Sequence, residues 1–131
     1  YLVFFLFYEL FTRQFNQKQL SSNKKQESSV LLIKSDKEII QLPLTDIFYF
    51  EGLKDYVKVY SKNEMYITKR TLVSLEEELD SEIFLRTQKS YIVNRKHIEK
   101  IKGNMIQING RDIPIGPSYQ ELINKIFTTS R

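Results

Sequence analysis

Short stretches in which apolar and polar residues alternate fill the chain from residue 30 onward, and a period of two residues is typical of β-strands. The clearest case is residues 55–60, where Val57 and Val59 fall on one face and Tyr56, Lys58 and Tyr60 fall on the other. Turn residues such as Gly103-Asn104 and Asn109-Gly110 separate the later runs. The further predicted strands are residues 30–34, 39–42, 47–50, 65–68, 84–86, 91–93, 98–101, 105–108 and 111–115.

Two segments have the spacing of an amphipathic helix instead. Leu72, Leu75 and Leu79 recur at intervals of three and four residues, and Thr71 precedes them as a candidate N-cap. A second apolar stripe follows Pro117, a residue that suits the first turn of a helix. The members of that stripe are Tyr119, Leu122, Ile123 and Ile126. The predicted fold class is therefore mainly β with minor α, with a mid-chain helix and a C-terminal helix.

The first 20 residues differ from the rest of the chain, because aromatic side chains recur in them at helical spacing. These are Phe4, Phe7, Phe11 and Phe15. The pattern predicts a helix over residues 1–20 and a polar linker over residues 21–29, ahead of a domain at residues 30–131. Residues 1–8 carry no charge and four basic residues follow them, so one interpretation is the cytoplasmic end of a transmembrane span that begins upstream. The other interpretation is an amphipathic helix that packs on the domain or on a second copy.

The composition argues against most kinds of enzyme. The chain has no cysteine and a single histidine, His97, which excludes thiol catalysis, disulfides and zinc sites built from thiolates or several histidines. Its four glycines are not spaced as a phosphate-cradling loop requires, and no nucleophile and base are spaced as in a hydrolase. We therefore expect no enzymatic activity, no metal and no cofactor, and we interpret His97 as a loop residue rather than a catalytic base.

The net charge of +4 is mild, but its distribution is uneven. Residues 31–131 hold 16 basic and 14 acidic side chains, and five of the acids lie within residues 76–82. Outside that stretch the domain has 16 basic and nine acidic side chains, as a phosphate-binding face requires. Taken alone, the acidic stretch is interpreted as the solvated face of the mid-chain helix.

Basic and polar side chains interrupt the strand pattern at three places. They are the segment around Lys54, the pair Lys69-Arg70 ahead of the mid-chain helix, and residues 86–91. Lysine and arginine suit phosphate oxygens, and amide side chains can hydrogen-bond base edges. For Arg86, contact with phosphate is narrowly favoured over an ion pair with an acid of the helix. For Asn94, a buried amide that holds a turn is favoured over a reader of bases.

Several blocks in the right order resemble the LytTR DNA-binding domain of bacterial transcription regulators. The most specific block runs from Phe84 to Ile98 and meets the spacing F-x-R-x-x-x-S-x-x-V-N-x-x-x-I in full. Supporting blocks are residues 46–52 with 55–59, residues 71–79, and residues 113–119. The resemblance covers about a hundred residues, nearly all of the chain beyond the linker.

The resemblance implies an elongated, mainly β domain that grips duplex DNA with loops rather than with a recognition helix. It assigns a first base-reading loop to Lys54, Asp55 and Tyr56, and a second to Pro117, Ser118 and Tyr119. It places Arg86, Lys89 and Ser90 at phosphates and the minor groove. Together with the basic and polar loop residues, the predicted DNA-binding set is Lys54, Asp55, Tyr56, Lys69, Arg70, Arg86, Gln88, Lys89, Ser90, Pro117, Ser118 and Tyr119.

One position departs from the family pattern. Many members carry an arginine that reads guanine where this chain has Pro117, and proline has no donor to offer a base. We therefore expect an altered or weaker sequence preference at that half of the site. The predicted function is sequence-specific DNA binding as the cytoplasmic output module of a membrane-tethered regulator of the two-component type, with a homodimer on paired half-sites. The alternative is an interaction module that has lost specific DNA binding.

Overall fold

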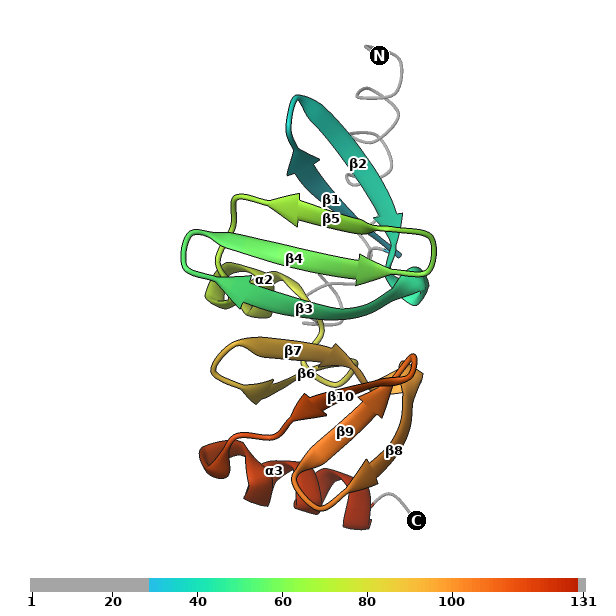
Figure 1. The fold of residues 1–131 in the computed structure, drawn as a ribbon, viewed down its shortest axis with the longest axis vertical. Helices are drawn as coiled ribbons and strands as arrows, with labels where there is room; N and C mark the ends of the chain where they lie inside the picture. Colours follow the sequence, from blue (N-terminus) through green and yellow to red (C-terminus); the bar gives the residue numbers. More distant parts are fainter. Residues whose placement is uncertain (1–28, 130–131) are drawn as a thin grey trace, which may run out of the picture.

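The computed structural model describes residues 29–129, and within them the chain forms ten strands and two α-helices (Figure 1). The strands are β1 (Val30–Ser35), β2 (Glu38–Pro43), β3 (Ile47–Leu53), β4 (Tyr56–Ser61), β5 (Met65–Thr68), β6 (Phe84–Gln88), β7 (Tyr91–Asn94), β8 (Ile98–Lys102), β9 (Met105–Ile108) and β10 (Arg111–Pro114). The helices are α2 (Leu72–Glu78) and α3 (Pro117–Thr129), and two 3-10 turns are η1 (Leu44–Asp46) and η2 (Arg95–His97).

The strands form three antiparallel sheets that follow one another along the long axis of the molecule (Figure 1). The β1–β2 hairpin lies at one end, the five-stranded sheet β5-β4-β3-β7-β6 lies in the middle, and the sheet β10-β9-β8 lies with α3 at the other end. This arrangement confirms the predicted fold class, an elongated and mainly β domain with two helices.

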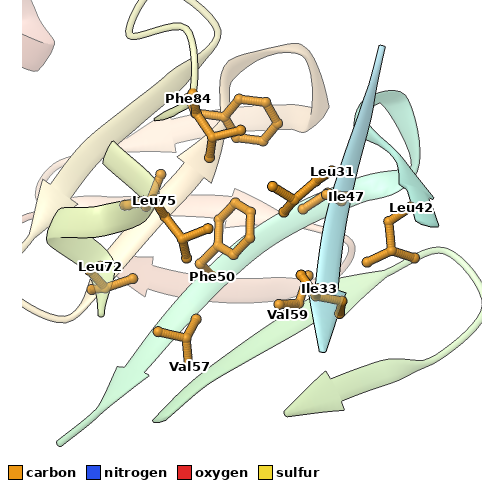
Figure 2. Packing of buried hydrophobic residues seen from close by; sticks show 12 residues of the cluster. Leu31, Ile33, Leu42, Ile47, Phe50, Val57, Val59, Leu72, Leu75 and Phe84 are labelled. Carbon is orange, nitrogen blue, oxygen red and sulfur yellow. The ribbon is translucent and has the colours of Figure 1, made fainter. Parts of the chain in front are cut away.

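The five-stranded sheet separates two cores, because alternate residues of each strand point to opposite faces. On one face Phe50 and Ile92 are cross-strand partners in a first core, which is completed by leucines of α2 and by apolar residues of β1 (Figure 2). On the other face Tyr49 and Val93 are partners in a second core with isoleucines of β9, β10 and α3. The first core thus packs the β1–β2 hairpin and α2 on one face of the sheet, and the second core packs β9, β10 and α3 on the other face.

The local predictions for residues 29–129 are largely confirmed. Thr71 caps α2, since its Oγ1 accepts a hydrogen bond from the backbone nitrogen of Ser74 at 3.1 Å, and α3 begins at Pro117. The predicted third strand, residues 47–50, is longer than expected and ends at Leu53, because its last residues pair with β4. The predicted helix at residues 1–20 and the linker at residues 21–29 lie almost entirely outside the described residues. No helix of the described part, 29–129, is long and apolar enough to cross a membrane.

Candidate nucleic-acid interface

The predicted DNA-contacting segments come together along one edge of the molecule, on the left in Figure 1. The β3–β4 turn carries Lys54 and Asp55, and the connection from β5 to α2 carries Lys69 and Arg70. The β6–β7 turn and the start of α3 follow farther down the same edge. The four segments are far apart in sequence, and the pairing of strands in the sheets brings them to the same edge.

Backbone hydrogen bonds connect the β6–β7 hairpin with the neighbours of two other segments. The backbone nitrogen of Gly52 donates to the carbonyl oxygen of Ser90 at 2.8 Å, and the backbone nitrogen of Gly116 donates to the carbonyl oxygen of Thr87 at 2.8 Å. The β6–β7 hairpin is therefore bonded to β3 two residues before the β3–β4 turn, and to the residue that precedes α3.

Neighbouring side chains leave little room for a Cβ atom at either of these glycines. A Cβ atom on Gly52 would lie 2.9 Å from Cδ1 of Leu72, and one on Gly116 would lie 3.2 Å from Cγ of Gln88. Neither glycine has a positive φ, so their value lies in close approach rather than in an unusual backbone conformation. From the sequence, these glycines were only excluded as parts of a phosphate-cradling loop, because local sequence does not show which segment each one faces.

The β3–β4 turn presents its side chains to solvent. Lys54 adopts a left-handed backbone conformation with φ of 40°, as a tight two-residue hairpin turn requires. Lys54 and Asp55 are exposed, and Tyr56 is 48% exposed despite its size. A cation, an anion and an aromatic hydroxyl at one hairpin tip can bond both phosphates and base edges.

The second segment, at the start of α3, has a different character. Pro117 and Ser118 are exposed, whereas Tyr119 packs against the second core and its backbone nitrogen donates to the carbonyl oxygen of Gly116 at 2.9 Å. Of the predicted contacts here, the Ser118 hydroxyl is the exposed polar side chain. Pro117 has no backbone N–H and an apolar ring, so it offers a base only an apolar contact.

The arginines and lysines of this edge have different environments. Arg70 makes an ion pair with Glu78 at 2.8 Å, and Arg86 makes one with Glu76 at 2.7 Å. The ion pair that was the alternative for Arg86 is therefore formed. Lys54, Lys69 and Lys89 are exposed, so the basic groups that face solvent at this edge are mainly lysines.

Comparison with known proteins agrees with this geometry. Residues 37–128 match the family described as the LytTr DNA-binding domain. This chain belongs to the LytTR DNA-binding domain family. The match spans most of the described residues, so the assignment concerns the whole β domain, a DNA-binding domain of transcription regulators.

Relatives share this LytTR domain at modest sequence identity. The chain is 29% identical over 107 residues to the sensory transduction protein LytT of Bacillus cereus, covering 77% of this chain and 44% of that protein. It is 35% identical over 65 residues to the heme-containing CO-sensing transcriptional regulator RcoM 2 of Paraburkholderia xenovorans, covering 49% of this chain and 24% of that protein. The chain thus spans less than half the length of these relatives.

A solved structure has the same fold. The LytTr DNA-binding domain of a putative methyl-accepting/DNA response regulator from Bacillus cereus superposes with a TM-score of 0.70 at 24% sequence identity. The match covers 77% of this chain and 98% of that one. The ten-stranded arrangement described above is therefore the LytTR fold.

Asn94, the last residue of the family's most specific block before Ile98, is structural in this LytTR domain. Its side chain is 1% exposed, and its amide nitrogen donates to the carbonyl oxygens of Ile47 at 2.8 Å and Leu44 at 3.3 Å. Its amide oxygen accepts from the backbone nitrogen of Lys96 at 3.0 Å. The prediction of a buried amide that holds a turn is confirmed.

His97 does not belong to the segments predicted to contact DNA. One ring nitrogen lies 2.5 Å from the carbonyl oxygen of Thr45, and the ring meets Phe48 edge-on with centroids 4.9 Å apart. Among the described residues no group of three or more His, Asp or Glu side chains could hold a metal ion.

Proposed function

We propose that this LytTR domain binds duplex DNA in a sequence-specific manner through the edge formed by the β3–β4 turn, the β6–β7 turn and the start of α3, as the output module of a bacterial transcription regulator. The observation that carries the proposal is the pair of 2.8 Å backbone hydrogen bonds that joins the β6–β7 hairpin to the end of β3 and to the residue before α3. Segments bonded in this way keep fixed distances from one another, and fixed distances are needed to meet a DNA duplex in a single register.

The roles divide by chemistry. Lys54, Asp55 and Tyr56 at the exposed hairpin tip supply a donor, an acceptor and a hydroxyl, so they are proposed to read bases. Lys69 and Lys89 are exposed point charges, which suit phosphate contacts that position the protein without reading sequence. Ser118 would contact bases as part of the second base-reading segment. Gln88 and Ser90 would lie over the DNA between the two base-reading segments.

A binding experiment with the full chain tests the proposal. A duplex is first selected from a random pool by the chain itself, and its affinity is compared with that of a scrambled duplex while salt is raised from about 50 to 200 mM. We expect tighter binding to the selected duplex and a linear fall of log affinity with log salt concentration, by about 0.9 per phosphate contacted. Equal affinity for both duplexes, or an affinity that salt does not change, would favour the alternative of an interaction module without specific DNA binding.

We further propose that residues 1–8 are the cytoplasmic end of a membrane span. This span would hold the DNA-binding domain at the inner face of the membrane, where a second copy would pack beside it on paired half-sites. The support is the uncharged aromatic run followed by Arg13, Lys18, Lys24 and Lys25. Cell fractionation of the full-length protein tests this. Extraction only by detergent is expected, and release by carbonate or high salt would leave the amphipathic-helix interpretation.

A further inference from the structure

The guanidinium group of Arg86 bonds the last residue of β6 and the first residue of the β6–β7 turn. Its Nε donates to the carbonyl oxygen of Gln88 at 2.9 Å, and its Nη2 donates to that of Lys89 at 2.6 Å. The register of β6 with β7 shifts between Arg86 and Gln88, so the turn follows an irregular stretch of strand. A register shift of this kind disrupts the strand ladder locally, so the side-chain bonds of Arg86 add to the few ladder bonds at this point.

The third bond of the guanidinium reaches a different element. Nη1 donates to Oε1 of Glu76 on α2 at 2.7 Å, and the Arg86 side chain is only 15% exposed. Three of its five N–H donors are thus directed at protein oxygens, in the planar fork that only arginine provides. Glu76 is therefore linked through Arg86 to the turn that carries Lys89.

We infer that Glu76 and Arg86 are positioning residues for DNA binding, and that they act by fixing the β6–β7 turn against α2. The inference rests on the proposed function, because it assigns to these residues the placement of the turn in that interface. It gives a carboxylate near the DNA-facing edge a favourable effect on binding. Simple electrostatics predicts the opposite, since a negative charge near phosphates repels them.

The ion pair between Arg70 and Glu78 differs from the pair between Arg86 and Glu76 in what its arginine connects. Arg70 pairs with Glu78 at 2.8 Å, but its other bonds go to Oγ and the carbonyl oxygen of Ser74, which lies in α2 itself. That arginine braces the helix on which its acid lies. Arg86 instead joins α2 to a turn of the sheet.

A positioning role predicts that removing the charge of Glu76 weakens DNA binding, whereas electrostatic repulsion predicts that it strengthens binding, so this substitution distinguishes the two. Glu76→Gln and Glu77→Gln remove the same charge from adjacent positions of α2, and Glu77 is exposed. Affinity for a duplex selected by the unmodified chain is measured with each full-length variant, together with thermal unfolding. We expect Glu76→Gln to weaken binding about tenfold, because the ion pair is reduced to a hydrogen bond with a neutral acceptor, while Glu77→Gln binds as tightly as the unmodified chain or more tightly.

Two further variants separate positioning from other roles. Arg86→Lys keeps the charge but not the fork, so it should weaken binding as much as Glu76→Gln does, whereas a direct phosphate contact would survive. In a Lys89→Ala background, Glu76→Gln should lose most of its effect, because both changes then act through one turn. A role in overall stability would leave the two effects additive.

The outcomes also distinguish this inference from the proposed function. If the unmodified chain binds the selected duplex and Glu76→Gln binds as tightly as Glu77→Gln, the positioning role is overturned and the DNA-binding function stands. Additive effects of Glu76→Gln and Lys89→Ala overturn it as well. No binding by the unmodified chain overturns both.

Discussion

The backbone nitrogen of Gly52 donates a hydrogen bond to the carbonyl oxygen of Ser90 over 2.8 Å, and this bond fixes the end of β3 to the β6–β7 turn. Gly52 lies in β3 two residues before Lys54 at the hairpin tip, so the bond limits how far this tip lies from Lys89. The equivalent bond between Gly116 and Thr87 does the same for the start of α3. The edge is thus held by backbone atoms, which keep their positions better than long side chains do.

Gly52→Ala should disturb this edge. The added Cβ would lie 2.9 Å from the side chain of Leu72, a buried residue of the first core, so either that side chain or the end of β3 must shift. Overpacking of this kind costs about 1–3 kcal/mol of unfolding free energy. We expect lower stability in urea and weaker discrimination between selected and scrambled duplexes.

Gly110→Ala is the control for that change. Gly110 lies in the β9–β10 turn on the opposite edge, with φ of 75° and nothing within 4 Å of an added Cβ (Figure 1). Its substitution should cost about 1 kcal/mol through backbone strain and leave discrimination unchanged. Equal loss of discrimination in both variants would show that lowered stability, rather than loop spacing, is responsible.

Lys89→Ala should weaken binding to selected and scrambled duplexes by the same factor, because phosphate contacts carry no sequence information. The slope of log affinity against log salt should become shallower by about 0.9, the value for one phosphate contact. Lys62→Ala removes an equal charge from the β4–β5 turn on the far edge and should leave that slope unchanged (Figure 1). A change of sequence preference in Lys89→Ala would contradict the assignment.

Stability should fall in strongly alkaline solution through Tyr60. Burial, and then the hydrogen bond that its hydroxyl donates to Oε1 of Glu51 at 3.0 Å, raise the pKa of Tyr60 from 10.0 to about 12. Since the folded state holds this proton more tightly than the unfolded state, the contribution is complete below pH 10.0 and is lost as pH rises to about 12.

Tyr60→Phe tests this dependence, because it keeps the ring stacked on Tyr49, whose centroid is 4.3 Å away, and removes the hydroxyl. The difference in unfolding free energy between the two proteins should shrink between pH 10 and 12. Tyr91 contributes in the same direction in both proteins, since burial and a bond to Oε2 of Glu51 raise its pKa as well. Curves that stay parallel would show that the Tyr60 proton has no part in stability.

Most of the secondary structure could be predicted from local pattern alone. Alternation in residues 55–60 and the cap at Thr71 are properties of neighbouring residues, and both reappear as β4 and α2. The extension of β3 to Leu53 could not be predicted, because it depends on pairing with β4 and on the bond from Gly52 to Ser90. Local sequence does not show which segment an extended backbone will meet.

The candidate site shows the same limit. That the basic loops share one edge follows from the order of strands in the sheet, which the residues themselves do not reveal. The acids of residues 76–82 were interpreted as a solvated face, yet Glu76 and Glu78 each form an ion pair with an arginine of the predicted DNA-binding set. Ion pairs between residues eight and ten positions apart connect a helix with its flanking segments, and no periodic pattern predicts them.

Pro117→Arg should create a preference for guanine at one position of the binding site. Pro117 is exposed as the first residue of α3, next to the bond between Gly116 and Thr87, so a side chain there can extend from a fixed backbone. A guanidinium can donate two hydrogen bonds to O6 and N7 of guanine, which gives about 1–3 kcal/mol of discrimination against other bases. Loss of proline from the first turn should lower stability slightly.

A scan in which each base pair of the selected duplex is replaced in turn measures this effect. Pro117→Ala is the matched control, since it removes the proline without adding a donor, so any change shared by both variants comes from the loss of the ring. We expect a new guanine preference only in Pro117→Arg, at a single position of each half-site, because the proposed function places the segment around Ser118 against one groove of the duplex. If the scan gives the same base preferences for both variants, the start of α3 does not face the base edges. Base reading would then rest on the β3–β4 turn.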